Sequence, residues 1–406
     1  MRQLIFLSII AILLSACKNS SNKENEDDSV VANNPLPKNA VPIVYVDYLY
    51  IKGNIDSVQG NFLLDTGADN LYLDSIFHST NNFEYDNSYQ RKIYGIGNAF
   101  QKITIIKDSV SFSFGNFNYR TSFVPIVKLK PVGGDYIDGL IGTSYFLQSV
   151  LEINYAKEYI NIFKTIDSVD ISDYQIVPMG RNDHHFYVPL TVKINDSTTI
   201  TGNFNIDTGT PFSTFTSSVA KTYNLTDKIK RKVRYYTEYG GVGGESSGYD
   251  FIADSVQISD YQLVNVNMSY SADWSGVLAS EEYSGILGSN ILDRFDIIFD
   301  FKNSNLYLKP NEKFNESYVF DRMGFSYVDR CKTMKGWIVA SLTENSAAER
   351  QGLKIDDKII SVNDIPVEQI PYETQEAYFR KINKAKFVIL RGDVLKTLEF
   401  ELTPLL

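Results

Sequence analysis

The feature that most constrains the fold of this 406-residue chain is a short motif that it contains twice. The first copy, GNFLLDTGADN, occupies residues 60–70, and the second, GNFNIDTGTPF, occupies residues 202–212. In each copy an apolar run leads into an aspartate, Asp65 or Asp207, which is followed by Thr-Gly as in a tight polar turn. The chain is therefore expected to build the same carboxylate-bearing turn twice.

The similarity between the two halves continues downstream of these turns. With a net insertion of four residues, DGLIGTSYFLQSVLEINYAKEYINIF (138–163) aligns with SGILGSNILDRFDIIFDFKNSNLYLK (284–309). Matches that keep their order over such a distance indicate an internal repeat. We predict two lobes on one plan, at residues 41–165 and 175–312.

Composition favours strands. The chain has 27 tyrosines and 25 phenylalanines, and aromatic and β-branched residues fit the pleated surface of a sheet. The runs VPIVYVDYLYIKG (41–53) and FYVPLTVKIND (186–196) predict strands that lead towards the DTG turns. A formal net charge of -10, with no basic stripe, argues against nucleic acid as a partner.

The N-terminus has the pattern of an export signal. The apolar run 4–14 is too short to span a bilayer and is typical of a signal-peptide core. The letters LSAC, which end at Cys17, resemble a bacterial lipobox, so residues 1–16 are expected to be removed and Cys17 to be lipidated. The polar residues 17–40 would then tether the protein to the membrane at the cell envelope, on the periplasmic or outer-surface side.

Two points about this leader stay open. An ordinary secretory signal with an incidental cysteine also fits the letters, and the acidic KENEDD after Cys17 is either an export signal to the outer face or a solvated tether. The second cysteine is Cys331, so with Cys17 lipidated no disulfide forms within the chain. The fold is then expected to stand on its hydrophobic cores.

Two carboxylates in matched turns can do chemistry that one cannot. If Asp65 and Asp207 come within a few ångströms they cannot both ionise, so they share one proton. The ionised member can act as general base on water while the protonated member donates to a carbonyl. Taken alone, each DTG has a plainer interpretation as an Asp-rich turn. In these turns Gly67 and Gly209, which lack a Cβ, would allow close backbone approach. The hydroxyls of Thr66 and Thr208 would hydrogen-bond locally and hold the turn.

On these residues the chain resembles the aspartic proteases of the retropepsin and pepsin type, over about residues 41–312. Each lobe has the same ordered triplet: the DTG turn, a glycine-rich stretch, and two apolar residues with a glycine. The later parts are YGIGN (94–98) and LIG (140–142) in the first lobe, and YGGVGGE (239–245) and ILG (286–288) in the second.

The resemblance implies a mostly β, two-lobed fold with a cleft. Asp65 and Asp207 would be the catalytic pair at its floor, and the glycine-rich hairpins would be flaps over a peptide or protein substrate. The flap glycines implied to bind substrate are Gly95, Gly97, Gly241 and Gly243.

The two sides of this cleft are expected to differ. DTGAD in the first lobe is the retropepsin form, which implies that Asp69 binds the substrate backbone; a solvated turn carboxylate is the alternative. The second lobe has Thr210 and Pro211 there, closer to the pepsin form. The flap tyrosine typical of pepsins has no secure match, although Tyr94 and Tyr239 each precede the flap glycines.

Other catalytic classes have little support in the sequence. The chain has three histidines, His78, His184 and His185, and no HExxH or paired CxxC spacing, so we expect no metal and no cofactor. Because His184 and His185 are adjacent, they would point to opposite faces of a strand, and we interpret them as strand-edge residues. No GxSxG elbow or complete nucleotide-binding loop is present.

The C-terminal segment 316–406 changes character, with a short helical patch that closes at Gly352 and a following strand and turn. It resembles a bacterial PDZ domain, through SAA (346–348), GL (352–353), Asp357 and Asn363. The resemblance implies a carboxylate-binding loop made of Gly336, Trp337, Ile338 and Val339. The sequence departs from the family at Asp356 and Asp364, where glycine is usual.

The combined prediction is a secreted, lipid-anchored aspartic endopeptidase, without a metal or a covalent intermediate. Its PDZ domain would either bind a peptide or partner terminus by strand addition, or pack against the lobes as a support. Two other functions stay open: a non-catalytic two-lobed scaffold that binds peptides, and a protease restricted to one envelope partner that the PDZ domain presents.

Overall fold

The computed structural model describes residues 35–182 and 185–406. Strands dominate these ranges, and none of the helices described in them is longer than six residues, so the prediction of a mostly β fold is confirmed. No helix in the described ranges is long and apolar enough to cross a membrane. The predicted signal peptide (1–16), Cys17, most of the tether and His184 lie outside the described residues.

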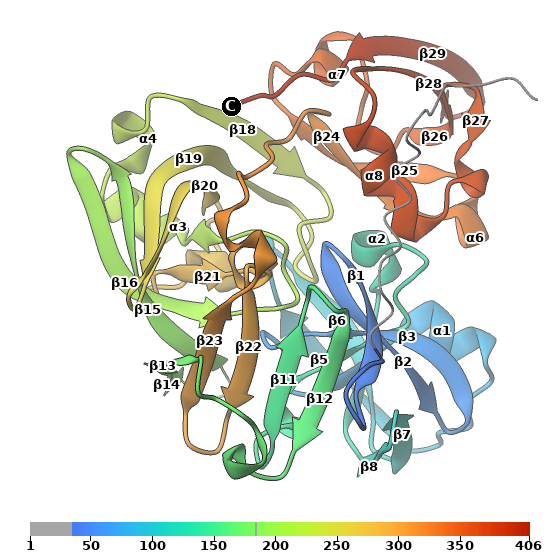
Figure 1. Ribbon diagram of the computed structural model, residues 1–406. Coiled ribbons are helices and arrows are strands. Elements are labelled where there is room, and N and C mark those ends of the chain that lie inside the picture. The colour runs from blue at the N-terminus through green and yellow to red at the C-terminus, as the bar shows by residue number, and fades with distance from the viewer. Residues whose placement is uncertain (1–34, 183–184) are drawn as a thin grey trace, which may run out of the picture. The chain divides into compact units, whose positions relative to one another are not determined.

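The first lobe contains strands β1 to β12, which all belong to one large sheet (Figure 1). Two short helices, α1 and α2, follow β4 and β9. The elements are β1 (Val41–Val46), β2 (Tyr48–Ile55), β3 (Val58–Leu64), β4 (Leu71–Asp74), α1 (Ser75–Thr80), β5 (Ser88–Tyr94), β6 (Phe100–Ile106), β7 (Val110–Phe114), β8 (Phe117–Thr121), β9 (Val124–Val127), α2 (Lys130–Gly133), β10 (Gly139–Ile141), β11 (Val150–Asn154) and β12 (Tyr159–Phe163).

The second lobe repeats this plan with strands β13 to β23. Most of them form a second sheet, while β13, β22 and β23 extend the sheet of the first lobe. The elements are β13 (Gln175–Pro178), β14 (Gly180–Asn182), β15 (His185–Asn195), β16 (Thr198–Ile206), β17 (Thr214–Phe215), α3 (Ser217–Thr222), α4 (Leu225–Lys228), β18 (Lys232–Thr237), β19 (Ser246–Ile258), β20 (Tyr261–Ser271), β21 (Gly285–Leu287), α5 (Ser289–Leu292), β22 (Phe295–Asp300) and β23 (Asn305–Pro310).

Strands β11 and β22 pair antiparallel and show how the lobes are related. The alignment of the repeats makes Glu152 the counterpart of Ile298, and the structure pairs these two residues directly across the ladder. Two equivalent strands that pair about a shared centre are related by a twofold axis. The lobes are therefore arranged about an approximate twofold axis at this pair of residues.

The strand before each DTG turn is held in the core by an equivalent aromatic side chain. Phe62 in β3 and Phe204 in β16, the aromatic residues of the two GNF sequences, are both fully buried. Phe62 contacts Phe112 edge-on and Phe204 contacts Phe215 in the same way. Burial of a side chain of this size contributes about 1.5–3 kcal/mol. Both aspartates therefore follow strands that are anchored by equivalent side chains.

The C-terminal domain has its own core, in which the fully buried Trp337 stacks on Tyr327 with 4.3 Å between ring centroids. Strand β25 of this domain also pairs with β18 of the second lobe. The elements are β24 (Phe325–Asp329), α6 (Cys331–Met334), β25 (Trp337–Thr343), α7 (Ala347–Arg350), β26 (Lys358–Val362), β27 (Ile365–Pro366), α8 (Gln375–Arg380), β28 (Lys384–Arg391) and β29 (Val394–Glu401).

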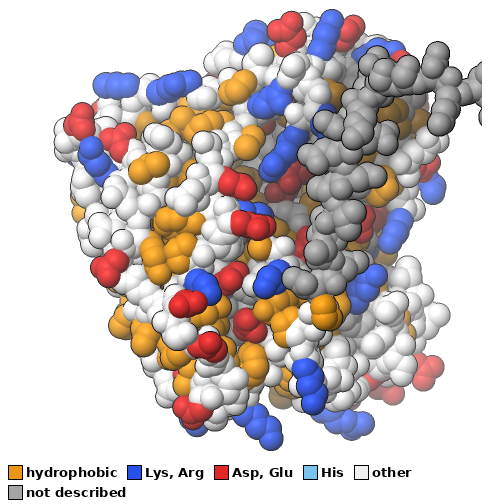
Figure 2. Space-filling view, viewed as in Figure 1, with side chains coloured by type: hydrophobic (Ala, Val, Ile, Leu, Met, Phe, Trp, Pro, Cys, Tyr) orange, Lys and Arg blue, Asp and Glu red, His pale blue; other side chains and the backbone are white. Residues whose placement is uncertain are grey.

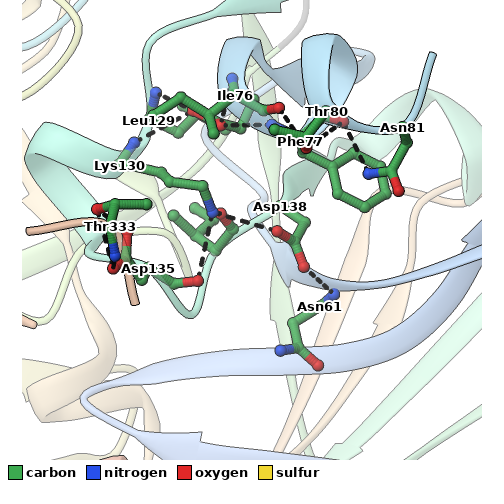
Figure 3. A network of polar contacts seen from close by, with 12 residues as sticks. Asn61, Ile76, Phe77, Thr80, Asn81, Leu129, Lys130, Asp135, Asp138 and Thr333 are labelled. Atoms are coloured by element: carbon green, nitrogen blue, oxygen red, sulfur yellow. Dashed lines mark hydrogen bonds and ion pairs between the residues drawn. The ribbon is translucent and has the colours of Figure 1, made fainter. Parts of the chain in front are cut away.

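A chain of polar contacts connects the C-terminal domain to the first lobe (Figure 3). Asp135, in the loop after α2, accepts a hydrogen bond from the Thr333 N–H at 2.8 Å. Lys130 donates to the Asp135 carbonyl at 3.3 Å and to Asp138 at 3.2 Å. Asp138 in turn accepts from the Asn61 N–H at 3.0 Å. Since Asn61 lies in β3, the network ends on the strand that leads to Asp65.

Charge is distributed without a dominant sign on the face drawn in Figure 2, where Lys and Arg side chains are scattered among acidic ones. This face has no basic stripe that would follow a phosphate backbone. The absence of a nucleic-acid partner stays a prediction.

Candidate active site

The two DTG turns begin where β3 and β16 end. The Asp65 N–H donates to the Ile141 carbonyl at 3.0 Å, and the Asp207 N–H donates to the Leu287 carbonyl at 3.0 Å. The accepting residues belong to the LIG and ILG motifs, which form β10 and β21 and run parallel to β3 and β16. The third part of the repeated triplet therefore positions each aspartate at the end of its strand.

The threonines of the turns bond across the lobes. Thr66 Oγ1 donates to the Ile206 carbonyl at 2.9 Å and accepts from the Thr208 N–H at 3.0 Å. Thr208 Oγ1 donates to the Leu64 carbonyl at 2.7 Å and accepts from the Thr66 N–H at 3.1 Å. The prediction that the threonine hydroxyls bond locally is wrong, because the twofold axis places each turn against its own copy. The four reciprocal bonds hold the two turns together.

The glycines of the turns allow the two carboxylates to approach. Each glycine N–H donates to the aspartate of its own turn at 2.8 Å. A Cβ atom on Gly67 would lie 2.6 Å from Asp207 Oδ2, and one on Gly209 would lie 2.6 Å from Asp65 Oδ1. Only glycine fits at these distances, as the sequence predicts, so Asp65 and Asp207 meet across the axis.

The environment of this pair favours one shared proton. Burial raises the pKa of Asp65 well above its usual range, and the charge of Asp207 and a hydrogen bond with it raise this pKa further. Burial also raises the pKa of Asp207, but the Gly209 N–H and a hydrogen bond from Asp65 counteract the effect. The pair is therefore expected to hold one proton between its two carboxyls, and the causes that raise the pKa are strongest at Asp65.

Two further residues lie near the pair that the sequence did not indicate. His185, the first residue of β15, places its Nε2 3.1 Å from the Gly67 carbonyl of the opposite lobe, and its charge lowers the pKa of Asp207. Tyr48 begins β2 and holds the counterpart position in the first lobe. Burial raises its pKa, and both dyad carboxylates add to the effect.

Our interpretation of His185 as a strand-edge residue gave its strand correctly but missed its place in the site. The register of the hairpins identifies the place of His185 in the site. Counting back from the GNF motifs aligns β2 with β15, so that Tyr48 corresponds to His185. The other histidine within the described residues, His78, lies on α1.

The two sides of the site differ beyond the dyad. In the first lobe, the Tyr72 hydroxyl donates to Asp69 at 2.6 Å, so this carboxylate is part of a bonded turn. In the second lobe, Pro211 holds the position of Asp69 and brings no carboxylate, and the neighbouring Phe212 exposes 62% of its surface. Binding of the substrate backbone by Asp69 stays a prediction.

The glycine-rich stretches form the tips of two hairpins, which we call the first flap (β5–β6) and the second flap (β18–β19). The tips bond to each other, since the Gly243 N–H donates to the Ile96 carbonyl at 2.8 Å and the Ala99 N–H to the Gly243 carbonyl at 2.8 Å. A Cβ on Gly97 would lie 2.5 Å from the Gly243 carbonyl carbon, and one on Gly241 would lie 2.9 Å from Ile96.

The four predicted flap glycines therefore lie together, because Gly95 also faces the second flap at Val242. Their small size serves the contact between the tips. Contact of these glycines with a substrate stays a prediction.

The residues predicted as a carboxylate-binding loop of the PDZ domain do not form a loop. Trp337, Ile338 and Val339, which follow Gly336, lie in β25 and are buried. One edge of β25 pairs with β24, and the other pairs with β26 and β18. The prediction of a loop beside a free edge at this position is wrong, because Trp337 and Val339 build the core of the domain and Ile338 belongs to a second buried cluster.

Within the described residues, no group of three or more His, Cys, Asp or Glu side chains could hold a metal ion. The absence of a metal and of a cofactor stays a prediction.

Comparisons with known proteins were made for the whole chain. Residues 190–291 match a family model described as aspartyl protease, and residues 319–390 match the PDZ domain model. No curated protein matches the chain. Among solved structures, an aspartic proteinase from Irpex lacteus is similar at 13% identity and a TM-score of 0.44, over 68% of this chain and 98% of that chain.

The family matches, together with the duplicated lobes, define the class of this protein. It is a two-lobed protein of the aspartic-protease fold with a C-terminal PDZ domain. The aspartyl protease match falls in the second lobe, whose strand plan the first lobe repeats.

Proposed function

We propose that the protein is an aspartic endopeptidase. The observation that carries this proposal is the pair of buried carboxyls, held face to face by four reciprocal threonine hydrogen bonds and biased to share one proton. A fixed acid next to a fixed base is what general acid–base hydrolysis of a peptide bond needs.

In the proposed mechanism each carboxyl has one role. Asp207 removes a proton from a water molecule, whose oxygen attacks the peptide carbonyl carbon, while Asp65 gives its proton to the carbonyl oxygen. The proton on Asp207 then moves to the leaving nitrogen as the C–N bond breaks, and Asp65 regains a proton as the new carboxyl forms. Water is the only co-reactant, and no covalent enzyme intermediate arises.

We further propose that the enzyme works at the cell envelope, tethered by a lipid on Cys17, with the PDZ domain binding a peptide or partner. The support for the anchor is the signal-peptide pattern and the LSAC letters. The support for the partner role is the PDZ family match.

A peptide library tests the activity most simply. The soluble form that starts after Cys17 is incubated with the library from acidic to neutral pH, beside Asp65→Asn and Asp207→Asn, and products are identified by mass spectrometry. We expect cleavage by the wild type and a loss of about 10²- to 10⁴-fold in either variant, because each removes a proton-transfer group.

Circular dichroism of the variants controls for folding. No cleavage by the wild type at any pH, combined with tight peptide binding, would contradict the proposal and favour the non-catalytic scaffold. Cleavage that persists in both variants would place the chemistry elsewhere in the molecule.

A further inference from the structure

The second flap is attached to the PDZ domain through its backbone. Strand β18 pairs with β19 inside the flap and, on its other edge, with β25 of the PDZ domain. The pairing with β25 runs from Tyr235 opposite Thr343 to Thr237 opposite Ser341. A strand added to a sheet in this way gains main-chain hydrogen bonds that hold its register. The edge of β25 predicted to capture a ligand is thus occupied by the chain's own flap.

Side chains reinforce this attachment along the length of β18. Thr237 Oγ1 donates to the Ala340 carbonyl at 2.7 Å, and the Tyr236 hydroxyl donates to Glu349 at 3.1 Å. The Glu344 N–H donates to the Arg234 carbonyl at 2.8 Å. The PDZ domain therefore contacts the flap strand at successive residues.

Tyr239 makes the contact nearest to the flap tip, directly before the glycines. Its hydroxyl donates to Asp356 Oδ1 at 2.6 Å, and its ring packs against a buried cluster of the PDZ domain, formed by Val328, Ile338 and Ala340. This tyrosine thus faces the PDZ domain, whereas Tyr94 of the first flap exposes 65% of its surface.

Asp356 is one of the two positions where the sequence departs from the usual PDZ glycine. Its φ is +67°, a left-handed conformation that glycine adopts more easily than aspartate. The position thus carries a side chain in spite of an unfavourable backbone, and that side chain bonds to the flap.

The first flap has no such support in the described part of the chain. Its outer strand β5 ends the sheet, pairs with β6 and is exposed along most of its length. Its tip is held by the second flap and by a neighbouring loop, since the Asn98 N–H donates to the Glu245 carbonyl at 2.9 Å and Asn98 Oδ1 accepts from the Trp274 N–H at 2.8 Å. The second flap is therefore one of the two supports that hold the tip of the first.

We propose that the PDZ domain anchors the second flap, and through it the closed position of both flaps, with Asp356 and Tyr239 as positioning residues. The consequence for substrates rests on the proposed endopeptidase function. The anchor itself is a property of the fold and can be measured without any cleavage.

Asp356→Gly in the full chain is the test, and Asp364→Gly is its matched control. Asp364 also has a φ of +67° in the PDZ domain, but its carboxylate bonds to Lys386 and contacts no flap residue. Both changes relieve the same left-handed backbone, so both variants should keep or raise the melting temperature. Only Asp356→Gly removes the carboxylate that accepts the hydrogen bond from Tyr239 of the second flap.

Hydrogen exchange of the flap tips, residues 95–99 and 240–245, is the readout. We expect exchange to be about tenfold faster in Asp356→Gly, the effect of losing one hydrogen bond to a charged group, and unchanged in Asp364→Gly. Tyr239→Phe should give the same increase, and the double variant should add little, because both changes remove one bond. Asp356→Asn keeps an acceptor oxygen and should restore part of the protection.

Three results would overturn the anchor. The first is equal exchange of the flap tips in Asp356→Gly and Asp364→Gly. The second is faster exchange over the whole PDZ domain of Asp356→Gly, together with a lower melting temperature. The third is an additive increase in exchange when Asp356→Gly and Tyr239→Phe are combined. In an active enzyme, Asp356→Gly should also raise KM several-fold with less effect on kcat. An inactive wild type with the expected exchange pattern would sink the proposed function and leave the anchor standing.

Discussion

The two flaps come from one repeated plan but have different neighbours. In the first flap, β5 is an exposed edge strand, while in the second, β18 lies between β19 and the PDZ strand β25. The DTG turns, by contrast, keep the same bonds on both sides of the axis. The difference teaches that the carboxyl pair depends on symmetry between the lobes, whereas the position of the second flap depends on the PDZ domain.

The largest effect is expected where the PDZ domain meets the body of the first lobe. The buried Asp135 accepts from Arg330 Nε at 3.0 Å, so Asp135→Ala leaves a buried guanidinium without its carboxylate. Breaking a buried pair in this way costs about 3–5 kcal/mol. We expect a clear fall in the urea midpoint of unfolding, with the second flap still attached at β25.

Glu399→Ala is the control for this change, since Glu399 pairs with Lys384 on an exposed surface. Its urea midpoint should stay close to that of the wild type. A similar midpoint for Asp135→Ala would show that the first lobe does not depend on the PDZ domain, and would leave the flap as its main attachment.

A smaller, local effect is expected from Gly97→Ala at the tip of the first flap. Gly97 has a φ of +111°, and its added Cβ would meet the Gly243 carbonyl carbon at 2.5 Å, so the tips must separate. Gly244→Ala is the matched control, because Gly244 also has a positive φ, +77°, but its nearest neighbour is 4.0 Å away.

The control should cost only the backbone strain of about 1–2 kcal/mol, while Gly97→Ala should also free both flap tips in hydrogen exchange. Equal exchange in the two variants would contradict the claim that the tips hold each other. Faster exchange confined to the first flap would show that the second is held by the PDZ domain alone.

The smallest effect is expected in the pH dependence of stability that arises from the pair of Asp65 and Asp207. Because the pKa of Asp65 is raised on folding from 3.8, the folded chain binds this proton more tightly than the unfolded chain. The resulting stability is complete below pH 3.8 and is lost as the pH rises towards the raised pKa. Asp65→Asn should therefore lose less stability than the wild type between pH 4 and pH 7, measured by thermal unfolding.

Asp364→Asn, on an exposed turn of the PDZ domain, is the control and should follow the wild-type curve. Parallel curves for the wild type and Asp65→Asn would contradict a raised pKa in the folded state. This comparison separates the dyad from the general effect of removing a carboxylate.

The sequence predicts the fold well where its motifs occur in both halves of the chain. Asp65 and Asp207, their glycines and the LIG and ILG strands follow from an alignment of one half of the chain on the other. Partners that face each other across the twofold axis could not be predicted in this way, which is why the threonine bonds to Ile206 and Leu64 were missed.

The PDZ domain shows a different limit. Its family pattern indicates its strands, but the Gly-Trp sequence at 336–337 looks like a loop until the burial of Trp337 in the core is known. The bond between Asp356 and Tyr239 joins residues 117 positions apart, so no local pattern contains it. The sequence does signal that position 356 is unusual, because aspartate replaces the usual PDZ glycine there. Only the structure shows that this aspartate bonds to Tyr239 of the second flap.

The central claim is that Asp65 and Asp207 share one proton in a buried pair. Carbon-13 NMR of labelled aspartate carboxyl groups tests it directly, with Asp65→Asn and Asp207→Asn used to assign the two resonances. The account predicts that Asp65 titrates well above pH 3.8 and that Asp207→Asn lowers its pKa, because the neighbouring charge is gone. Two independent titrations near pH 4, unchanged by either substitution, would contradict it.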